Sequence, residues 1–273
     1  MKSPVSHTKK VGDFSAQYYD IDGSVPVVIF LHGIAMSKDW SLDYYREAGW
    51  KNNMILLDLP GHNGVPMEKI DTFEDIATSI GDFAEDLSLE NVVIAGYSLG
   101  GMVSLACADI LGDKLWLKGV VSWASPILGL SGISERGRIV FSGIINSAPT
   151  LYNAANREAL LRLGSRLYGL GLTEIEIQMI SRFPYESARK YGSMILEYSS
   201  GLDMKVPTLL IYGTHDLLVN DRNYEFARQR AGEKCRVERV ENGGHVGSPD
   251  AWNEVTMMMG SFFEEVGKSG VKR

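Results

Sequence analysis

The stretch NVVIAGYSLGG, residues 91–101, decides the fold of this 273-residue chain. Its first five residues form a short, largely β-branched apolar run, which is typical of a strand buried on both faces of a parallel sheet. The pattern Gly-x-Ser-x-Gly follows at once, and a helical pattern over Gly100–Leu111 comes directly after it. A sharp strand-to-helix turn crowds its backbone, so it needs small residues two positions either side of the serine. The placement therefore predicts that Ser98 stands above the carboxyl edge of a sheet, at the N-terminus of a helix.

Similar apolar runs recur along the chain, and segments with helical periodicity separate them. The runs cover Val25–Leu31, Asn53–Leu57, Leu117–Trp123, Thr208–Tyr212 and Cys235–Val240. Helices are predicted over Thr72–Leu87, Gly100–Leu111 and Asp221–Ala231. Val11–Asp20, followed by the turn residues Asp22, Gly23 and Ser24, is expected to form an antiparallel hairpin at one edge. This alternation of strands and helices predicts an open α/β sheet.

The alternation stops near Ser125. From there to about Asp203 the pattern is helical, with no convincing strand, and Thr173 with Glu176 predicts a capping box. We therefore expect a core of residues 1–124 and 204–273, with a helical cap of residues 125–203 inserted between two core strands.

The composition excludes several classes of protein. Hydrophobic residues make up 45% and charged residues 22% of the chain, which is ordinary for a soluble globular protein. The formal net charge of −7 is not the excess of basic residues that is typical of proteins with a nucleic-acid partner. The longest apolar runs, such as Val25–Leu31, are too short to span a membrane.

The N-terminal residues and the cysteines predict a cytoplasmic protein. The opening MKSPVSHTKK contains basic residues but no apolar segment after them, so we expect no secretory signal. Cys107 and Cys235 are expected to be buried free thiols, which fits a reducing compartment.

A nucleophilic serine needs a base within hydrogen-bond reach, and the base needs an acid that fixes its tautomer. His245 follows a glycine-rich loop after the run Cys235–Val240, and Asp216 lies just past the end of the run Thr208–Tyr212. We therefore predict Ser98 as nucleophile, His245 as base and Asp216 as orienting acid. Asp58 is a rival acid, but its turn sequence Asp-Leu-Pro-Gly favours a structural role. The remaining loop histidines, His32, His62 and His215, are expected to be hydrogen-bond donors that stabilise loops.

An acyl-transfer site also needs donors for the oxyanion of the tetrahedral intermediate. The backbone N–H of Leu99, directly after the nucleophile, is the first predicted donor. The second is the N–H of Ile34, in the loop after the run Val25–Leu31, where Gly33 allows the backbone to come close to the substrate.

Together these motifs resemble those of the α/β-hydrolase superfamily from about Val11 to Gly267. The landmarks are LHGIA (31–35), DLPGH (58–62), GYSLGG (96–101), YGTHDLLV (212–219) and NGGH (242–245). The resemblance implies a central, mostly parallel eight-stranded sheet flanked by helices, with the helical stretch 125–203 as a cap over the site. The order Ser98, Asp216, His245 along the chain is also that of this superfamily.

Serine at the elbow separates the chain from haloalkane dehalogenases and epoxide hydrolases, which have aspartate there. Among the serine members it is similar to small carboxylesterases and C–C bond hydrolases. The resemblance implies ester hydrolysis through an acyl-enzyme intermediate, with a small-molecule ester as substrate and no metal or organic cofactor. We expect small to medium hydrophobic acyl groups because the candidate pocket lining is apolar: Met36, Met102, Met179, Phe183, Tyr191, Met194 and Tyr198.

Alternatives remain open at this stage. The pocket residues are equally suited to packing the cap against the core, and the cap arginines Arg157, Arg162 and Arg166 form either solvated helix faces or an anion site. The same triad would serve thioester or C–C hydrolysis, acyl transfer or perhydrolysis. The chain also resembles the menaquinone-pathway lyase of this fold, although Met102 stands where that lyase has a basic residue. A more remote alternative is a ligand receptor derived from a hydrolase.

Overall fold

The computed structural model describes residues 4–12, 14–139, 154–168, 173–245 and 249–270. Eight strands form one sheet in the order β1-β2-β4-β3-β5-β6-β7-β8, in which β1 and β2 are antiparallel to their neighbours and the others run parallel. The predicted eight-stranded, mostly parallel sheet is therefore confirmed. The strands are β1 Ser6–Val11, β2 Phe14–Ile21, β3 Ser24–Leu31, β4 Asn52–Leu57, β5 Val92–Tyr97, β6 Leu117–Trp123, β7 Thr208–Gly213 and β8 Cys235–Val240.

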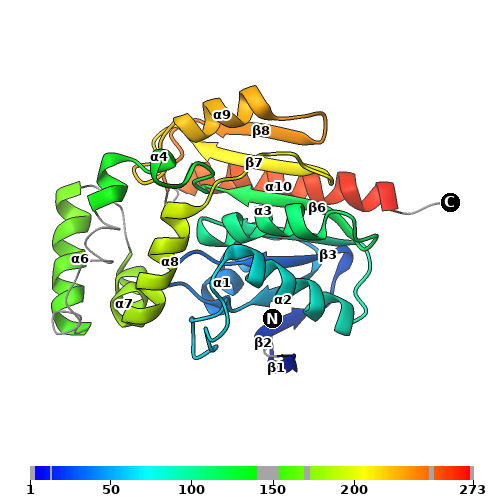
Figure 1. Ribbon diagram of the computed structural model, residues 1–273, viewed down its shortest axis with the longest axis horizontal. Coiled ribbons are helices and arrows are strands. Elements are labelled where there is room, and N and C mark those ends of the chain that lie inside the picture. The colour runs from blue at the N-terminus through cyan, green and yellow to red at the C-terminus, as the bar shows by residue number, and fades with distance from the viewer. Residues whose placement is uncertain (1–3, 13, 140–153, 169–172, 246–248, 271–273) are drawn as a thin grey trace.

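Helices cover both faces of the sheet (Figure 1). They are α1 Lys38–Ala48, α2 Phe73–Asp86, α3 Leu99–Leu111, α4 Gly129–Gly132, α6 Ala154–Tyr168, α7 Glu174–Arg182, α8 Tyr185–Glu197, α9 Arg222–Arg230 and α10 Pro249–Gly270. Successive residues of a strand point to opposite faces, so each central strand contributes to two hydrophobic clusters. In β3, Ile29 packs in the cluster that includes α2 and α3, whereas Phe30 packs in the cluster that includes α1 and α10. This burial on both faces explains why the central strands have continuous apolar sequences.

The edge hairpin lies earlier in the chain than the sequence predicts. Val11 pairs with Phe14, so the hairpin joins β1 to β2 through a turn at Gly12, not at residues 22–24. The segment Asp22–Gly23 instead leads from β2 to β3, and β4 lies between these two strands. A Cβ on Gly23 would lie 2.3 Å from the Asn52 carbonyl carbon, so glycine is required here for close approach to β4.

The segment between β6 and β7 forms helices at one end of the sheet (Figure 1). Helices α4, α6, α7 and α8 lie here, and the named elements within the described part of 125–203 are all helical. Residues 140–153 and 169–172 of the predicted cap lie outside the described residues. Strands β6 and β7 are neighbours, with Trp123 paired to Ile211, so this segment leaves and re-enters the sheet at adjacent strands.

Capping boxes are present at the starts of α2 and α7, and the one at α7 is the predicted pair of Thr173 and Glu176. The Thr72 side chain accepts a hydrogen bond from the Asp75 N–H, and the Asp75 carboxylate accepts one from the Thr72 N–H. Thr173 and Glu176 make the same reciprocal pair at the start of α7. Cys107 and Cys235 are buried and free, and no described helix is long and apolar enough to cross a bilayer.

The Thr72 cap provides a stability test. Thr72→Ala removes the acceptor for the Asp75 N–H, so the free energy of unfolding is expected to fall by about 1 kcal/mol. Thr78→Ala makes the same change inside α2, where the hydroxyl bonds only the Glu74 carbonyl, and should have little effect. Urea denaturation of both variants measures the difference, and equal stabilities would contradict the assignment of Thr72 as cap.

Candidate active site

Ser98 lies in the turn between β5 and α3, in a backbone conformation that L-residues rarely adopt. Its φ is 51° and its ψ is −113°. A Cβ on Gly96 would lie 2.1 Å from the Gly100 carbonyl oxygen, and a Cβ on Gly100 would lie 2.1 Å from the Leu31 carbonyl oxygen. The two glycines of the predicted elbow are therefore sterically required. The Ser98 N–H donates to the Trp123 carbonyl at 2.7 Å, which ties the turn to β6.

The structure brings Ser98, His245 and Asp216 together at the carboxyl edge of the sheet. The Ser98 Oγ lies 3.0 Å from the His245 Nε2, and the His245 Nδ1 lies 2.9 Å from the Asp216 Oδ2. Asp216 follows β7 and His245 follows β8, so each side chain comes from a loop at the end of a parallel strand. This is the hydrogen-bonded sequence that a serine nucleophile, its base and an orienting acid require.

One oxygen of the Asp216 carboxylate accepts hydrogen bonds from its own loop, and the other faces the imidazole of His245. Its Oδ1 accepts hydrogen bonds from the N–H groups of Leu218 and Val219, both at 2.8 Å. Its Oδ2 faces the His245 Nδ1, and the side chain is only 4% exposed. Because an ionised carboxylate only accepts, the Nδ1 of the neutral imidazole carries the proton. The lone pair of the His245 Nε2 then points at the Ser98 hydroxyl.

Tyr97 links the elbow to the histidine loop, and the sequence reasoning did not single it out. Its hydroxyl donates to the His245 carbonyl at 2.7 Å, and its ring centroid lies 5.5 Å from the imidazole. Burial and the nearby negative charge of Asp216 raise the pKa of Tyr97 well above 10, so the hydroxyl stays a donor. The only sequence signal was a bulky aromatic between Gly96 and the serine.

The two predicted oxyanion donors have free N–H groups. Leu99 is the first residue of α3, so its N–H has no carbonyl one turn earlier in the helix. In the loop after β3, the N–H groups of Ala35 and Met36 donate to His62 and to the Gly33 carbonyl. Among the described residues, none accepts a hydrogen bond from the N–H of Ile34 or Leu99. Both groups therefore stay the candidate oxyanion donors.

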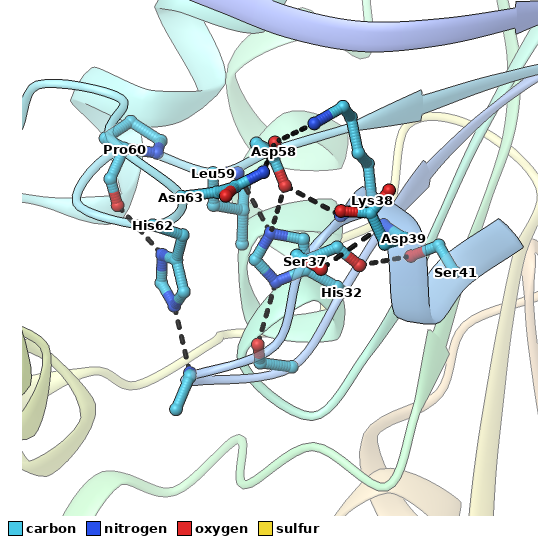
Figure 2. Close-up of polar contacts among 12 residues, drawn as sticks. His32, Ser37, Lys38, Asp39, Ser41, Asp58, Leu59, Pro60, His62 and Asn63 are labelled. Carbon is cyan, nitrogen blue, oxygen red and sulfur yellow. Dashed lines mark hydrogen bonds and ion pairs between the residues drawn. The ribbon is translucent and has the colours of Figure 1, made fainter. Parts of the chain in front are cut away.

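Asp58, the rival acid, belongs to a buried network that includes Lys38 and Asn63 (Figure 2), whereas His245 contacts Asp216. Its carboxylate is fully buried and accepts from the Lys38 Nζ at 2.8 Å, from the Lys38 N–H at 2.7 Å and from the Asn63 Nδ2 at 2.9 Å. Asn63 has a φ of +47°, a conformation that asparagine tolerates better than most residues. The expected structural role for Asp58 agrees with these contacts.

His32 and His62 are buried in the same network, and each uses both ring nitrogens. The His32 Nδ1 donates to the Gly33 carbonyl at 2.8 Å, and its Nε2 accepts from the Leu59 N–H at 3.1 Å. Burial lowers the pKa of His32, which keeps the ring neutral. The prediction that these histidines are simple donors was incomplete, because backbone N–H groups point at their second nitrogens.

The predicted pocket residues are mostly buried, and the aromatic ones pack helices of the predicted cap against the rest of the chain. The Phe183 ring lies 4.4 Å from His62, the Tyr191 hydroxyl donates to the Pro60 carbonyl at 2.8 Å, and the Tyr198 ring lies 5.2 Å from Phe73. These contacts favour packing for those three aromatic residues. Met36, Met102 and Met194 are also buried, and Met179 is half-buried.

Two of the cap arginines bind protein groups. Arg157 donates to the carbonyls of Phe183 and Ile180, and Arg162 pairs with Glu174 and Glu158. Arg166 is exposed. In the described ranges no group of three or more histidine, cysteine or acidic side chains is arranged to bind a metal ion.

Comparisons with known proteins match this chain to one family. The model of the alpha/beta hydrolase family matches residues 28–255. A 1-acylglycerol-3-phosphate O-acyltransferase of Arabidopsis thaliana is 24% identical over 83% of this chain and 64% of its own length. A 2-succinyl-6-hydroxy-2,4-cyclohexadiene-1-carboxylate synthase of Escherichia coli is 31% identical over 32% of this chain and 35% of its own. The chain thus spans less than two thirds of these curated relatives.

A solved structure extends the match to the whole fold. An esterase from Exiguobacterium antarcticum has a TM-score of 0.75 at 15% identity, covering 95% of this chain and 100% of that one. At this identity the likeness concerns the fold, and the chemistry has to be argued from the site.

The buried Lys38–Asp58 pair provides a second test of stability. Lys38→Met leaves the Asp58 carboxylate buried without its countercharge, so the free energy of unfolding should fall by about 3–5 kcal/mol. Lys205→Met removes an exposed ion pair with Asp113 and should change stability little. Guanidinium denaturation of the two variants compares them, and a Lys38→Met protein as stable as the control would contradict the importance of this pair.

Proposed function

The chain belongs to the alpha/beta hydrolase family, and on that premise we propose that it is a serine hydrolase cleaving carboxylic esters of small to medium hydrophobic acyl groups. The observation that carries the proposal is the unbroken hydrogen-bonded sequence from the Ser98 Oγ through His245 to Asp216. It supplies a nucleophile, a base with a free lone pair and a buried anion that stabilises the imidazolium.

In the first half of the reaction, the Ser98 Oγ attacks the ester carbonyl carbon and its proton passes to the His245 Nε2. The carbonyl oxygen becomes an oxyanion between the N–H groups of Leu99 and Ile34, which stabilise it. As the intermediate collapses, the bond to the alcohol breaks and the His245 Nε2 gives its proton to the leaving oxygen. The product of this half is an acyl-enzyme on Ser98.

In the second half, a water molecule takes the place of the alcohol. The His245 Nε2 accepts a proton from the water as its oxygen attacks the acyl carbon. The second tetrahedral intermediate releases the carboxylic acid, and the proton returns to the Ser98 Oγ. In this proposal, helices α7 and α8 of the predicted cap cover the site and determine which acyl groups enter.

The two free cysteines fit a cytoplasmic location.

Acyl transfer is the second candidate. The similarity to a plant acyltransferase extends over 83% of this chain, and the same acyl-enzyme would react with an alcohol acceptor in place of water. Thioester hydrolysis, C–C hydrolysis and perhydrolysis would also use this triad. Adding alcohols, including a lysophospholipid, to a hydrolysis assay separates transfer from hydrolysis by the product formed.

The lyase alternative has less support. Met102 is fully buried, and Arg157 and Arg162 bind protein groups, so these positions offer no cation to an acidic substrate. Glu176, which is buried in the capping box of α7, is acidic, so it does not supply the positive charge that an acidic substrate needs. An uncharged ester remains the better proposal.

Replacing the nucleophile tests the proposal directly. Ser98→Ala should abolish turnover of p-nitrophenyl esters and labelling by a fluorophosphonate, because no oxygen remains to be acylated. Ser104→Ala, in the same helix, removes a hydroxyl that bonds the Gly100 carbonyl and should keep both activities. Turnover by a folded Ser98→Ala protein at the wild-type rate would refute the mechanism.

Replacing the acid tests the tautomer argument. In Asp216→Asn, the amide oxygen is expected at the Oδ1 position, because two backbone N–H groups point there. The amide NH₂ then faces the His245 Nδ1 and moves the imidazole proton to the Nε2, which no longer accepts the serine proton. We expect kcat to fall by roughly 10³–10⁴-fold in steady-state assays.

Asp221→Asn is the control for this experiment. Asp221 lies five residues farther along the chain, and its exposed carboxylate pairs with the half-buried Arg239. Its kcat should stay near the wild-type value. A kcat for Asp216→Asn within threefold of that control would exclude Asp216 as the orienting acid.

A further inference from the structure

Two buried imidazoles lie against the loop that carries Ile34. His32 is 0% exposed, His62 is 1% exposed, and their ring centroids are 4.7 Å apart. Figure 2 shows His32 beside Asp58 and Leu59, and His62 next to Pro60. The rings come from the motifs LHGIA and DLPGH, and the proposed mechanism assigns no role to either imidazole.

His32 contacts the peptide unit that includes the Ile34 N–H. Its Nδ1 donates to the Gly33 carbonyl at 2.8 Å, and this carbonyl and the Ile34 N–H belong to the same peptide plane. In a trans peptide the C=O and the N–H point in opposite directions. A hydrogen bond that fixes the direction of the Gly33 carbonyl therefore also fixes the direction of the Ile34 N–H.

His62 contacts the next peptide unit. Its Nε2 accepts from the Ala35 N–H at 3.0 Å, and its Nδ1 donates to the Pro60 carbonyl at 3.0 Å. Ala35 has a φ of +61°, a left-handed conformation that costs energy for a residue with a side chain. The bond to His62 helps to keep this conformation, and the Met36 N–H closes the turn on the Gly33 carbonyl at 3.1 Å.

Only one protonation state of each ring fits these hydrogen bonds. The Asp58 carboxylate lies 3.7 Å from the His32 Nε2 and raises the pKa of His32, but burial lowers it more. A carbonyl only accepts and an N–H only donates, so the proton lies on the Nδ1 and the lone pair on the Nε2 in both rings. Burial lowers the pKa of His62 well below 6.5, and the neighbouring His32 lowers it further. The groups facing His62 are His32, Phe183 and Tyr191, and none of them is an anion that would favour a charged imidazole.

We propose that His32 and His62 are positioning residues that orient two successive peptide planes and so aim the Ile34 N–H at the substrate oxyanion. The proposal rests on the proposed acyl-transfer function for its catalytic consequence. Neither ring touches the reacting atoms. The His62 Nε2 accepts from the Ala35 N–H and the Gly33 carbonyl accepts from the Met36 N–H, whereas the Ile34 N–H has no acceptor among the described residues.

A matched pair of variants at His62 tests this proposal. In His62→Gln the side-chain oxygen takes the place of the Nε2 and still accepts from the Ala35 N–H, whereas His62→Leu offers no acceptor. We expect kcat for a p-nitrophenyl ester to fall by roughly tenfold to a hundredfold in His62→Leu, less than for loss of an oxyanion donor itself. KM should change less than threefold, because the oxyanion forms only in the transition state.

The conservative variant and an inhibitor separate positioning from general damage. His62→Gln should recover most of the lost kcat. A boronic acid that mimics the tetrahedral intermediate should lose affinity in His62→Leu by the same factor as kcat, while a substrate-like competitive inhibitor should not. Equal kcat values in wild type and a folded His62→Leu protein would overturn the proposal, as would equal losses of kcat in both variants.

Nuclear magnetic resonance on the whole protein gives a readout that needs no turnover. The ¹⁵N shifts of His32 and His62 should report the neutral Nδ1–H tautomer at pH 8, and an Nε2–H tautomer would overturn the proposal. The residual dipolar coupling of the Ile34 N–H should differ between His62→Leu and His62→Gln, and identical couplings would overturn it too. Fluorophosphonate labelling of Ser98, measured separately, shows whether the hydrolase proposal itself has failed.

Discussion

The site depends on backbone contact between the β5–α3 turn and the end of β3, closer than any side chain would allow. Gly100 lies so near the Leu31 carbonyl that a Cβ would overlap it, and Gly96 lies equally close to the Gly100 carbonyl. Because these residues have no side chains, α3 can begin directly behind Ser98. Its first N–H then lies next to the serine, and the loop after β3 lies next to both. One steric condition therefore places the proposed nucleophile and both proposed oxyanion donors in the same small region.

The histidines show how environment divides one residue type between two roles. His245 is 11% exposed at the side chain and lies between the Asp216 carboxylate and the Ser98 hydroxyl, which is the position that the proposed base requires. His32 and His62 are fully buried, and backbone groups occupy both nitrogens of each ring. Their lowered pKa values suit neutral rings that hold geometry. The two kinds of histidine differ in the partner of the Nε2, which is the Ser98 hydroxyl for His245 and a backbone N–H for His32 and His62.

Much of the fold could be predicted from the sequence, because short β-branched runs end at turn residues. The strands after Val25 lie within about two residues of those predicted. The edge hairpin was misplaced because Gly12 and Gly23 both signal a turn, and only the long-range pairing of β2 with β4 distinguishes them. Ser98, Asp216 and His245 could be brought together because each follows a parallel strand.

Other contacts could not be predicted, because they depend on which atoms face each other across loops far apart in sequence. The bond from the Tyr97 hydroxyl to the His245 carbonyl and the buried Lys38–Asp58 pair are of this kind. The segment between β6 and β7 illustrates a different consequence. Because it leaves and returns at neighbouring strands, its two ends stay close together whatever its length or sequence. Insertions, deletions or exchange of this segment can thus change what lies beside this end of the sheet without disturbing the register of the strands.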